Sequence, residues 1–190
     1  MKIEVRPLGL DGVVEIIPRK FGDDRGFFSE TWNSRDLAEA GMDIPFVQDN
    51  HSYSARAGVL RGLHYQLPPR AQDKLIRVVR GAIFDVAVDI RKGSPDFGKW
   101  VALEVSAARW NQILVPKGFA HGFVTLEPDT EVLYKTSDTY SAEHDRAIRF
   151  DDPEIGIKWP LPSDALQLSD KDRAAPHLVD AEVFSYAQAT

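Results

Sequence analysis

Short strand-like segments separated by Gly, Pro, Asp or Asn follow one another along most of this chain, and no other feature constrains its fold as strongly. They are rich in β-branched and aromatic residues, as β-strands are. In residues 82–90 acidic and apolar residues alternate, so Asp85 and Asp89 are expected on one face. The other face would carry Phe84, Val86, Val88 and Ile90. The predicted strands are residues 13–17, 26–32, 46–53, 58–65, 74–79, 82–90, 100–105, 112–115, 118–126 and 131–136.

The sequence predicts a single convincing helix. Ser34 can cap residues 35–40, and Gly41 can end the helix. The last quarter of the chain contains four prolines between residues 153 and 176 and is expected to be rich in loops. Many short strands with almost no helix favour a β-sandwich or barrel. A length of 190 residues fits one such domain.

Charge and composition exclude several classes of function. The formal net charge of −6 disfavours generic nucleic-acid binding, which needs a broad positive surface. Between residues 56 and 80, however, there are six basic residues and one acidic residue. This stretch is either a solvated basic surface or a pocket for a small polyanion such as a diphosphate. We find no apolar run of about 18 residues, so no membrane span is expected. The absence of cysteine excludes thiol chemistry and favours the cytoplasm.

The residues that could carry chemistry point to proton transfer. The five histidines are isolated in the sequence, which disfavours a metal site, and the motifs of serine hydrolases and of nucleotide-binding loops are missing. His64 shares a strand with Arg61, and Gly58 and Gly62 weaken that strand in a way that pure packing would not require. A lone strand histidine and a buried Tyr134 are both common as packing residues. On the residues alone, the interpretation ends at a β-barrel with a basic pocket suited to acid–base chemistry.

Nine short motifs, which follow one another along the chain, allow a more specific interpretation. They are DRGFFSE at 24–30, QDNHS at 48–52, GVLRGLHYQ at 58–66, KLIRV at 74–78, FDVAVDIR at 84–91, SPDFG at 94–98, VPKGFAHGF at 115–123, YK at 134–135 and LSDKD at 168–172. With this set the chain closely resembles the dTDP-4-dehydrorhamnose 3,5-epimerase family from about residue 10 to residue 175. An ordered series of motifs is far more specific than any one of them.

The resemblance implies an all-β, cupin-like jelly roll that works without metal or other cofactor. It implies one domain over residues 1–190, with strands in about 1–32 as a dimer arm and a loop-rich segment over about 151–190. The partners implied are a dTDP-4-keto-6-deoxyhexose substrate and a second copy in a homodimer with arm exchange, without nucleic acid or membrane. The implied reaction inverts C3 and C5 of dTDP-4-dehydro-6-deoxy-D-glucose, for dTDP-L-rhamnose biosynthesis in the cytoplasm.

The resemblance also assigns roles. Both reacting carbons flank the C4 ketone, so loss of either proton gives an enolate, which needs a base, an acid and a cation near the oxygen. By resemblance His64 is the base and Asp172 its carboxylate partner. Tyr134 returns the proton from the opposite face, and Lys74 lies near the enolate oxygen. The implied substrate-binding residues are Gln48, Asp49, Asn50, Arg61 at the diphosphate, His121, Asp145 and Lys171, with Arg25 and Glu30 reaching over from the other subunit.

Two details need explanation. The family often has Glu where this chain has Asp145, so that contact is shorter by one methylene. Strict alternation puts Arg61 and His64 on opposite faces of a strand, so a shared pocket requires a bulge near Gly62. Three alternatives stay open: an epimerase that inverts only C3 or only C5, a non-catalytic nucleotide-sugar binding module, and a metal-dependent cupin oxygenase.

Overall fold

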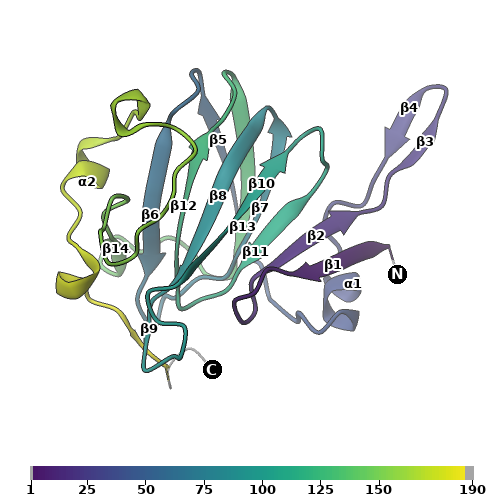
Figure 1. Cartoon of the computed structure of the whole chain (residues 1–190). Coiled ribbons are helices and arrows are strands. Elements are labelled where there is room, and N and C mark those ends of the chain that lie inside the picture. Colours follow the sequence, from purple (N-terminus) through teal and green to yellow (C-terminus); the bar gives the residue numbers. More distant parts are fainter. Residues whose placement is uncertain (1, 187–190) are drawn as a thin grey trace.

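Two antiparallel sheets face each other and form the body of the molecule in the computed structural model, which describes residues 2–186 (Figure 1). In spatial order, the first sheet contains β1 (Ile3–Pro7), β2 (Val14–Pro18), β11 (Gln112–Val115), β7 (Lys74–Arg80), β13 (Thr130–Thr136) and β5 (Gln48–Ser54). The second contains β10 (Trp100–Ser106), β8 (Ala82–Asp89), β12 (Phe119–Thr125), β6 (Leu60–Gln66) and β14 (Asp145–Ala147). The chain crosses repeatedly between the sheets, as in a jelly roll. The predicted all-β sandwich is confirmed.

Short elements complete the described part of the chain. They are the hairpin β3 (Phe21–Asp23) and β4 (Gly26–Phe28), the parallel pair β9 (Arg91–Lys92) and β15 (Phe184–Ser185), helices α1 (Ser34–Glu39) and α2 (Asp170–Arg173), and 3-10 turns at Ser163–Ala165 and Leu178–Asp180. None of the helices described is long and apolar enough to cross a membrane.

The alternation predicted for residues 82–90 is present in β8. Val86 and Val88 pack on the outer side of their sheet, where the C-terminal segment covers them through Ile155 and Leu178. The opposite face of β8 looks toward the first sheet and contributes Ile83 to the core between the sheets. Both faces of β8 are therefore buried, and its acidic residues lie inside the protein rather than in solvent.

The helix begins differently from the prediction. Asn33, not Ser34, is the N-cap: its side-chain oxygen accepts hydrogen bonds from the backbone N–H groups of Arg35 and Asp36 at 3.0 and 3.4 Å. Asn33 has the extended conformation that an N-cap needs, whereas Ser34 already belongs to the helix. The helix buries Leu37 against the outer face of the first sheet.

A hairpin extends away from the body of the molecule. The predicted strand over residues 26–32 is a strand only over Gly26–Phe28, where it pairs with β3 (Figure 1). Phe27 and Phe28 are 56% and 65% exposed, which is unusual for side chains of this size. Strand pairing in the hairpin is confined to β3 and β4, and Phe27 packs edge-on against Trp110 of the body with ring centroids 4.8 Å apart.

Candidate active site

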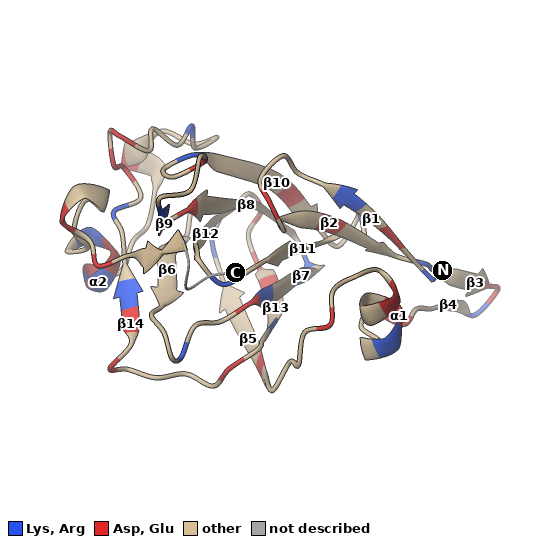
Figure 2. Ribbon diagram, turned by 90° about the horizontal axis from the view of Figure 1, so that it is seen from below, with Lys and Arg blue, Asp and Glu red and all other residues tan. Residues whose placement is uncertain are grey.

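Two cavities meet inside the sandwich, toward the edge formed by β5, β6 and β14. The larger has a volume of about 450 Å³ and includes Arg61 and His121 in its lining. The smaller, of about 240 Å³, lies toward β14, whose acidic and basic residues are visible in Figure 2. His64, Lys74 and Tyr134 line both cavities. The junction of the cavities is therefore where the predicted base, acid and lysine come together.

A bulge in β6 places Arg61 and His64 on the same cavity. In the pairing of β6 with β12, His64 lies opposite His121 and Arg61 lies opposite Phe123. Arg61 and His64 are three residues apart on β6, whereas His121 and Phe123 are two residues apart on β12, so β6 has one extra residue here. Gly62 has φ +135°, and a Cβ there would lie 2.5 Å from the Cα of Gly122. Only glycine fits this crossing, so the bulge predicted near Gly62 is present.

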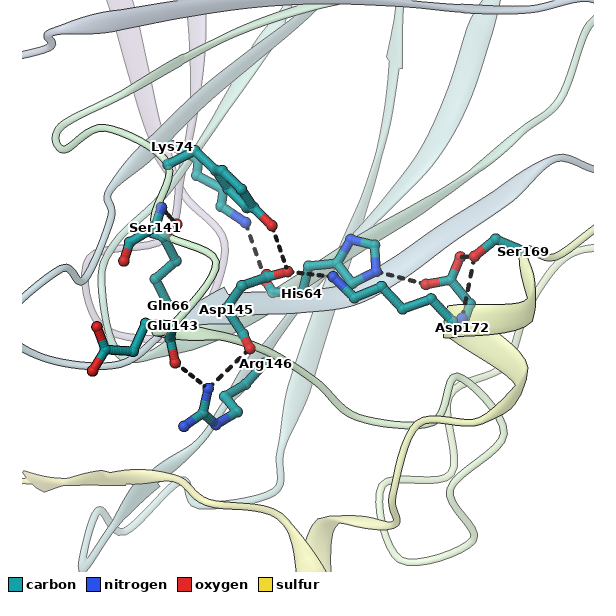
Figure 3. A network of polar contacts seen from close by, with 11 residues as sticks. His64, Gln66, Lys74, Ser141, Glu143, Asp145, Arg146, Ser169 and Asp172 are labelled. Atoms are coloured by element: carbon teal, nitrogen blue, oxygen red, sulfur yellow. Dashed lines mark hydrogen bonds and ion pairs between the residues drawn. The ribbon is translucent and has the colours of Figure 1, made fainter.

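His64 is held by a carboxylate on α2. Its Nε2 lies 2.6 Å from Asp172 Oδ1, and Ser169 Oγ donates to Asp172 Oδ2 at 2.7 Å (Figure 3). Burial opposes ionisation of Asp172, but hydrogen bonds from His64, Ser169 and the Gly62 backbone hold the pKa of this carboxyl below its ordinary value. An ionised carboxylate only accepts, so Nε2 of His64 carries a proton and Nδ1 is left to face the cavity.

Lys74 and Tyr134 face His64 from the other sheet. Lys74 Nζ donates to the backbone oxygen of His64 at 3.1 Å. Burial lowers the pKa of Lys74 to about 8, although Asp145 and Asp85 oppose the shift. Burial also raises the pKa of the Tyr134 phenol, so this side chain is a neutral hydrogen-bond donor at neutral pH. The site therefore combines a histidine with a carboxylate partner, a lysine and a protonated tyrosine.

The smaller cavity contains the predicted binding residues of β5, β14 and α2. Gln48 donates through its amide to Asn50 at 2.9 Å, and the amide nitrogen of Asn50 is buried without a partner among the described residues. Asp145 forms an ion pair with Lys171 and accepts from the Tyr140 hydroxyl at 3.4 Å. Figure 3 shows Asp145 on the opposite side of His64 from Asp172. These polar groups surround a space open to a ligand.

Three predicted residues lie away from these cavities. Asp49 is on the outward face of β5, paired with Lys135 at 3.1 Å, because alternation turns it away from Gln48 and Asn50. Arg25 is at the tip of the β3–β4 hairpin and pairs with Asp23. Glu30 pairs with Lys2 at 2.9 Å on the same side of the molecule.

The sequence reasoning missed several polar residues at the site, among them Asp85 and Ser52. Asp85 is completely buried, and its oxygens lie 3.0 and 2.9 Å from Nε2 of His121. Ser52 lines the larger cavity, and its hydroxyl is buried without a partner in the described chain. An aspartate within an aliphatic strand was a signal for the first, because a carboxylate is rarely buried without a partner. A serine in a polar strand gives no such signal.

Comparison with known proteins agrees with this geometry. A family model described as dTDP-4-dehydrorhamnose 3,5-epimerase matches residues 7–180. A curated protein of that name from Pseudomonas aeruginosa is 54% identical over 178 residues, which are 93% of this chain and 97% of the relative.

Two solved structures are also similar to this chain. One is the dTDP-4-dehydrorhamnose 3,5-epimerase of Bacillus anthracis with TDP and PPi bound, at 51% identity and a TM-score of 0.89, covering 92% of this chain and 99% of that one. The other is the dTDP-6-deoxy-D-glucose-3,5-epimerase of Legionella pneumophila in complex with dTDP-4-keto-L-rhamnose. It is 42% identical with a TM-score of 0.92, covering 97% of this chain and 98% of that one.

Proposed function

This chain belongs to the dTDP-4-dehydrorhamnose 3,5-epimerase family, and on that premise we propose that it converts dTDP-4-dehydro-6-deoxy-D-glucose to dTDP-4-dehydro-L-rhamnose. The reaction is an isomerisation that inverts C3 and C5. The observation that carries the proposal is that His64, backed by Asp172, and Tyr134 line one junction from opposite sheets. A sugar ring bound between the sheets would have a base on one face and an acid on the other, as epimerisation requires.

His64 is the proposed base. Asp172 fixes the proton on Nε2, so Nδ1 is free to remove a proton from C3 or C5, and the carboxylate then stabilises the imidazolium that forms. Tyr134 donates its phenolic proton to the opposite face of the enolate. Its raised pKa supports this role, because the phenol stays protonated until the proton is needed.

Lys74 is the proposed cation for the enolate. Loss of a proton next to the C4 ketone moves negative charge onto its oxygen, and a positioned ammonium stabilises that charge most where water is excluded. Lys74 is only 9% exposed. Because an ammonium is charged below its pKa, and the pKa of Lys74 is about 8, the cation dominates at neutral pH and is lost as the solution becomes alkaline.

The nucleoside diphosphate would extend from this junction toward the polar residues at its rim. We assign Arg61 to the diphosphate, because a guanidinium offers paired donors to phosphate oxygens. Gln48, Asn50, Lys171 and Asp145 would complete the contacts through the smaller cavity. The unpartnered amide of Asn50 supports this placement, since a buried donor without a partner is costly until a ligand accepts from it.

We further propose a homodimer in which the β3–β4 hairpin of each subunit completes the site of the other. Exposed Phe27 and Phe28 support it, because large aromatic side chains in a projecting hairpin are suited to a partner surface. Arg25 and Glu30, which lie outside the cavities of their own chain, would contact substrate in the neighbouring subunit. We also propose that residues 1–190 form one domain and, from the absence of cysteine, that the enzyme is cytoplasmic.

Arm exchange can be tested by complementation. Changing Arg25 to Ala should weaken substrate binding about tenfold or more, because a charged hydrogen bond is lost, while the exposed Arg35→Ala serves as a matched control. Mixed dimers of Arg25→Ala and His64→Asn subunits should regain activity, since one site per dimer then receives an intact hairpin and an intact histidine. A mixture no more active than its two components would exclude arm exchange, and a fully active monomer in dilute sedimentation would exclude the dimer.

The reaction itself is tested by proton NMR of dTDP-4-dehydro-6-deoxy-D-glucose incubated with the enzyme in D2O. Solvent deuterium should enter at both C3 and C5, and the product should have both centres inverted. Exchange and inversion at one carbon alone would identify an epimerase specific for C3 or C5. Binding of the nucleotide sugar without any exchange would identify a binding module instead.

A further inference from the structure

A second histidine–carboxylate pair lies beside the first. Asp85 on β8 is completely buried, and both of its oxygens contact Nε2 of His121 on β12, at 3.0 and 2.9 Å. The function proposed above gives Asp85 no role. His121 is only 8% exposed, and it lines the larger cavity.

Register places this pair next to His64. β8, β12 and β6 are neighbours in the sheet, and His121 pairs directly with His64 across the two strands. Adjacent strands are about 4.8 Å apart, and directly paired residues point to the same face. A sugar in contact with His64 is therefore within reach of His121 as well.

Asp85 is an unusual residue for the interior of a sheet. A carboxylate loses its hydration there and needs positive or hydrogen-bonding partners to stay ionised. Burial raises the pKa of Asp85, and His121 and then Lys74 act against that rise. The attraction also acts on Lys74. Burial lowers the pKa of Lys74, and Asp85 is one of the two carboxylates that oppose this lowering. One buried carboxylate thus supports two side chains of the reaction site.

We propose that Asp85 is a positioning residue of the enolate site, which orients His121 with Nε2–H toward the core and helps Lys74 remain an ammonium beside the sugar. The proposal rests on the epimerase function proposed above. Nδ1 of His121 has no hydrogen-bond partner among the described residues and is left for the ligand. The other charged or titratable groups that line the two cavities are Arg61, His64, Tyr65, Tyr134, Tyr140, Asp145, Lys171 and Asp172.

Changing Asp85 to Asn tests the electrostatic part of the proposal. The amide oxygen can still accept from His121, but the negative charge is gone. The pKa of Lys74 should then fall, so the alkaline decline in deuterium exchange at C3 and C5 should begin at lower pH. We expect roughly five-fold slower exchange than in the wild type near pH 8 and little difference near pH 6.

Asp89→Asn is a matched control, because Asp89 is an equally buried carboxylate on the same strand but pairs with Arg91. It should be destabilised to a similar extent and keep the wild-type pH profile. A profile for Asp85→Asn that is the same as the wild-type profile would overturn the electrostatic role while leaving the epimerase function intact. Absence of exchange in the wild-type enzyme would instead overturn the function.

A second measurement is made on the wild-type protein and does not depend on folding of Asp85→Asn. Nitrogen-15 NMR of the wild-type imidazoles, with His121 assigned by its loss in His121→Gln, reports which ring nitrogen carries a proton. A protonated Nε2 supports orientation by Asp85. An unprotonated Nε2 would overturn it, because the carboxylate would then have no donor to accept from.

Discussion

Changing His64 to Asn should remove both epimerisation and solvent exchange at C3 and C5. As the proposed base, His64 would start each half of the reaction, so no enolate should form without it. A positioned general base contributes about 10²- to 10⁴-fold to rate, and we expect a loss of that size. Proton NMR of the substrate in D2O measures exchange and inversion in the same sample.

The loss must be separated from damage to the fold. His51→Asn makes the same substitution on an exposed histidine that pairs with Glu131 at 2.9 Å, and it should retain activity. Asp172→Asn should resemble a weaker form of the His64 lesion, because the imidazole keeps its place but loses the carboxylate that sets its tautomer. Exchange of both protons at the wild-type rate in His64→Asn would show that another group is the base.

The sequence predicts the sheets better than it predicts their edges. Most of the long strands could be located from the alternation in residues 82–90 and from the Gly and Pro residues between strands. These signals are local, because they come from the strand and its two ends. The strands that were missed are β1, β3, β9, β14 and β15. β14 is Asp145–Ala147, three residues of mixed polarity whose pairing with β6 is set by the tertiary fold and leaves no periodic pattern.

The candidate site likewise contains some features that the sequence predicts and others that it does not. The bulge near Gly62 could be predicted, because two residues of one strand had to face one pocket. The outward position of Asp49 follows from the same alternation, yet the resemblance placed it with Gln48 and Asn50. No local pattern reveals that Asp85 contacts His121, since the pair depends on the register between two strands far apart in the chain. The positions proposed for Arg25 and Glu30 depend on a second subunit, which one sequence does not specify.

Tyr134→Phe should separate proton removal from inversion. The substitution keeps the ring in its place at the junction of the cavities and removes only the hydroxyl. The proposed base, His64, should still form the enolate, but the proposed acid is then missing from the opposite face. The intermediate should therefore take its proton back from His64, on the face from which it was removed.

The expected result is a substrate that gains deuterium at C3 and C5 while its configuration stays unchanged. Inversion should fall by about 10²-fold or more, as for loss of a general acid, and exchange should fall much less. His64→Asn should lose both, so the two variants differ in the ratio of exchange to inversion as well as in rate. Lys74 lies against both cavities and remains available for the enolate oxygen in either variant. Normal inversion by Tyr134→Phe would mean that water or another side chain delivers the second proton, and the role of Tyr134 would then be packing.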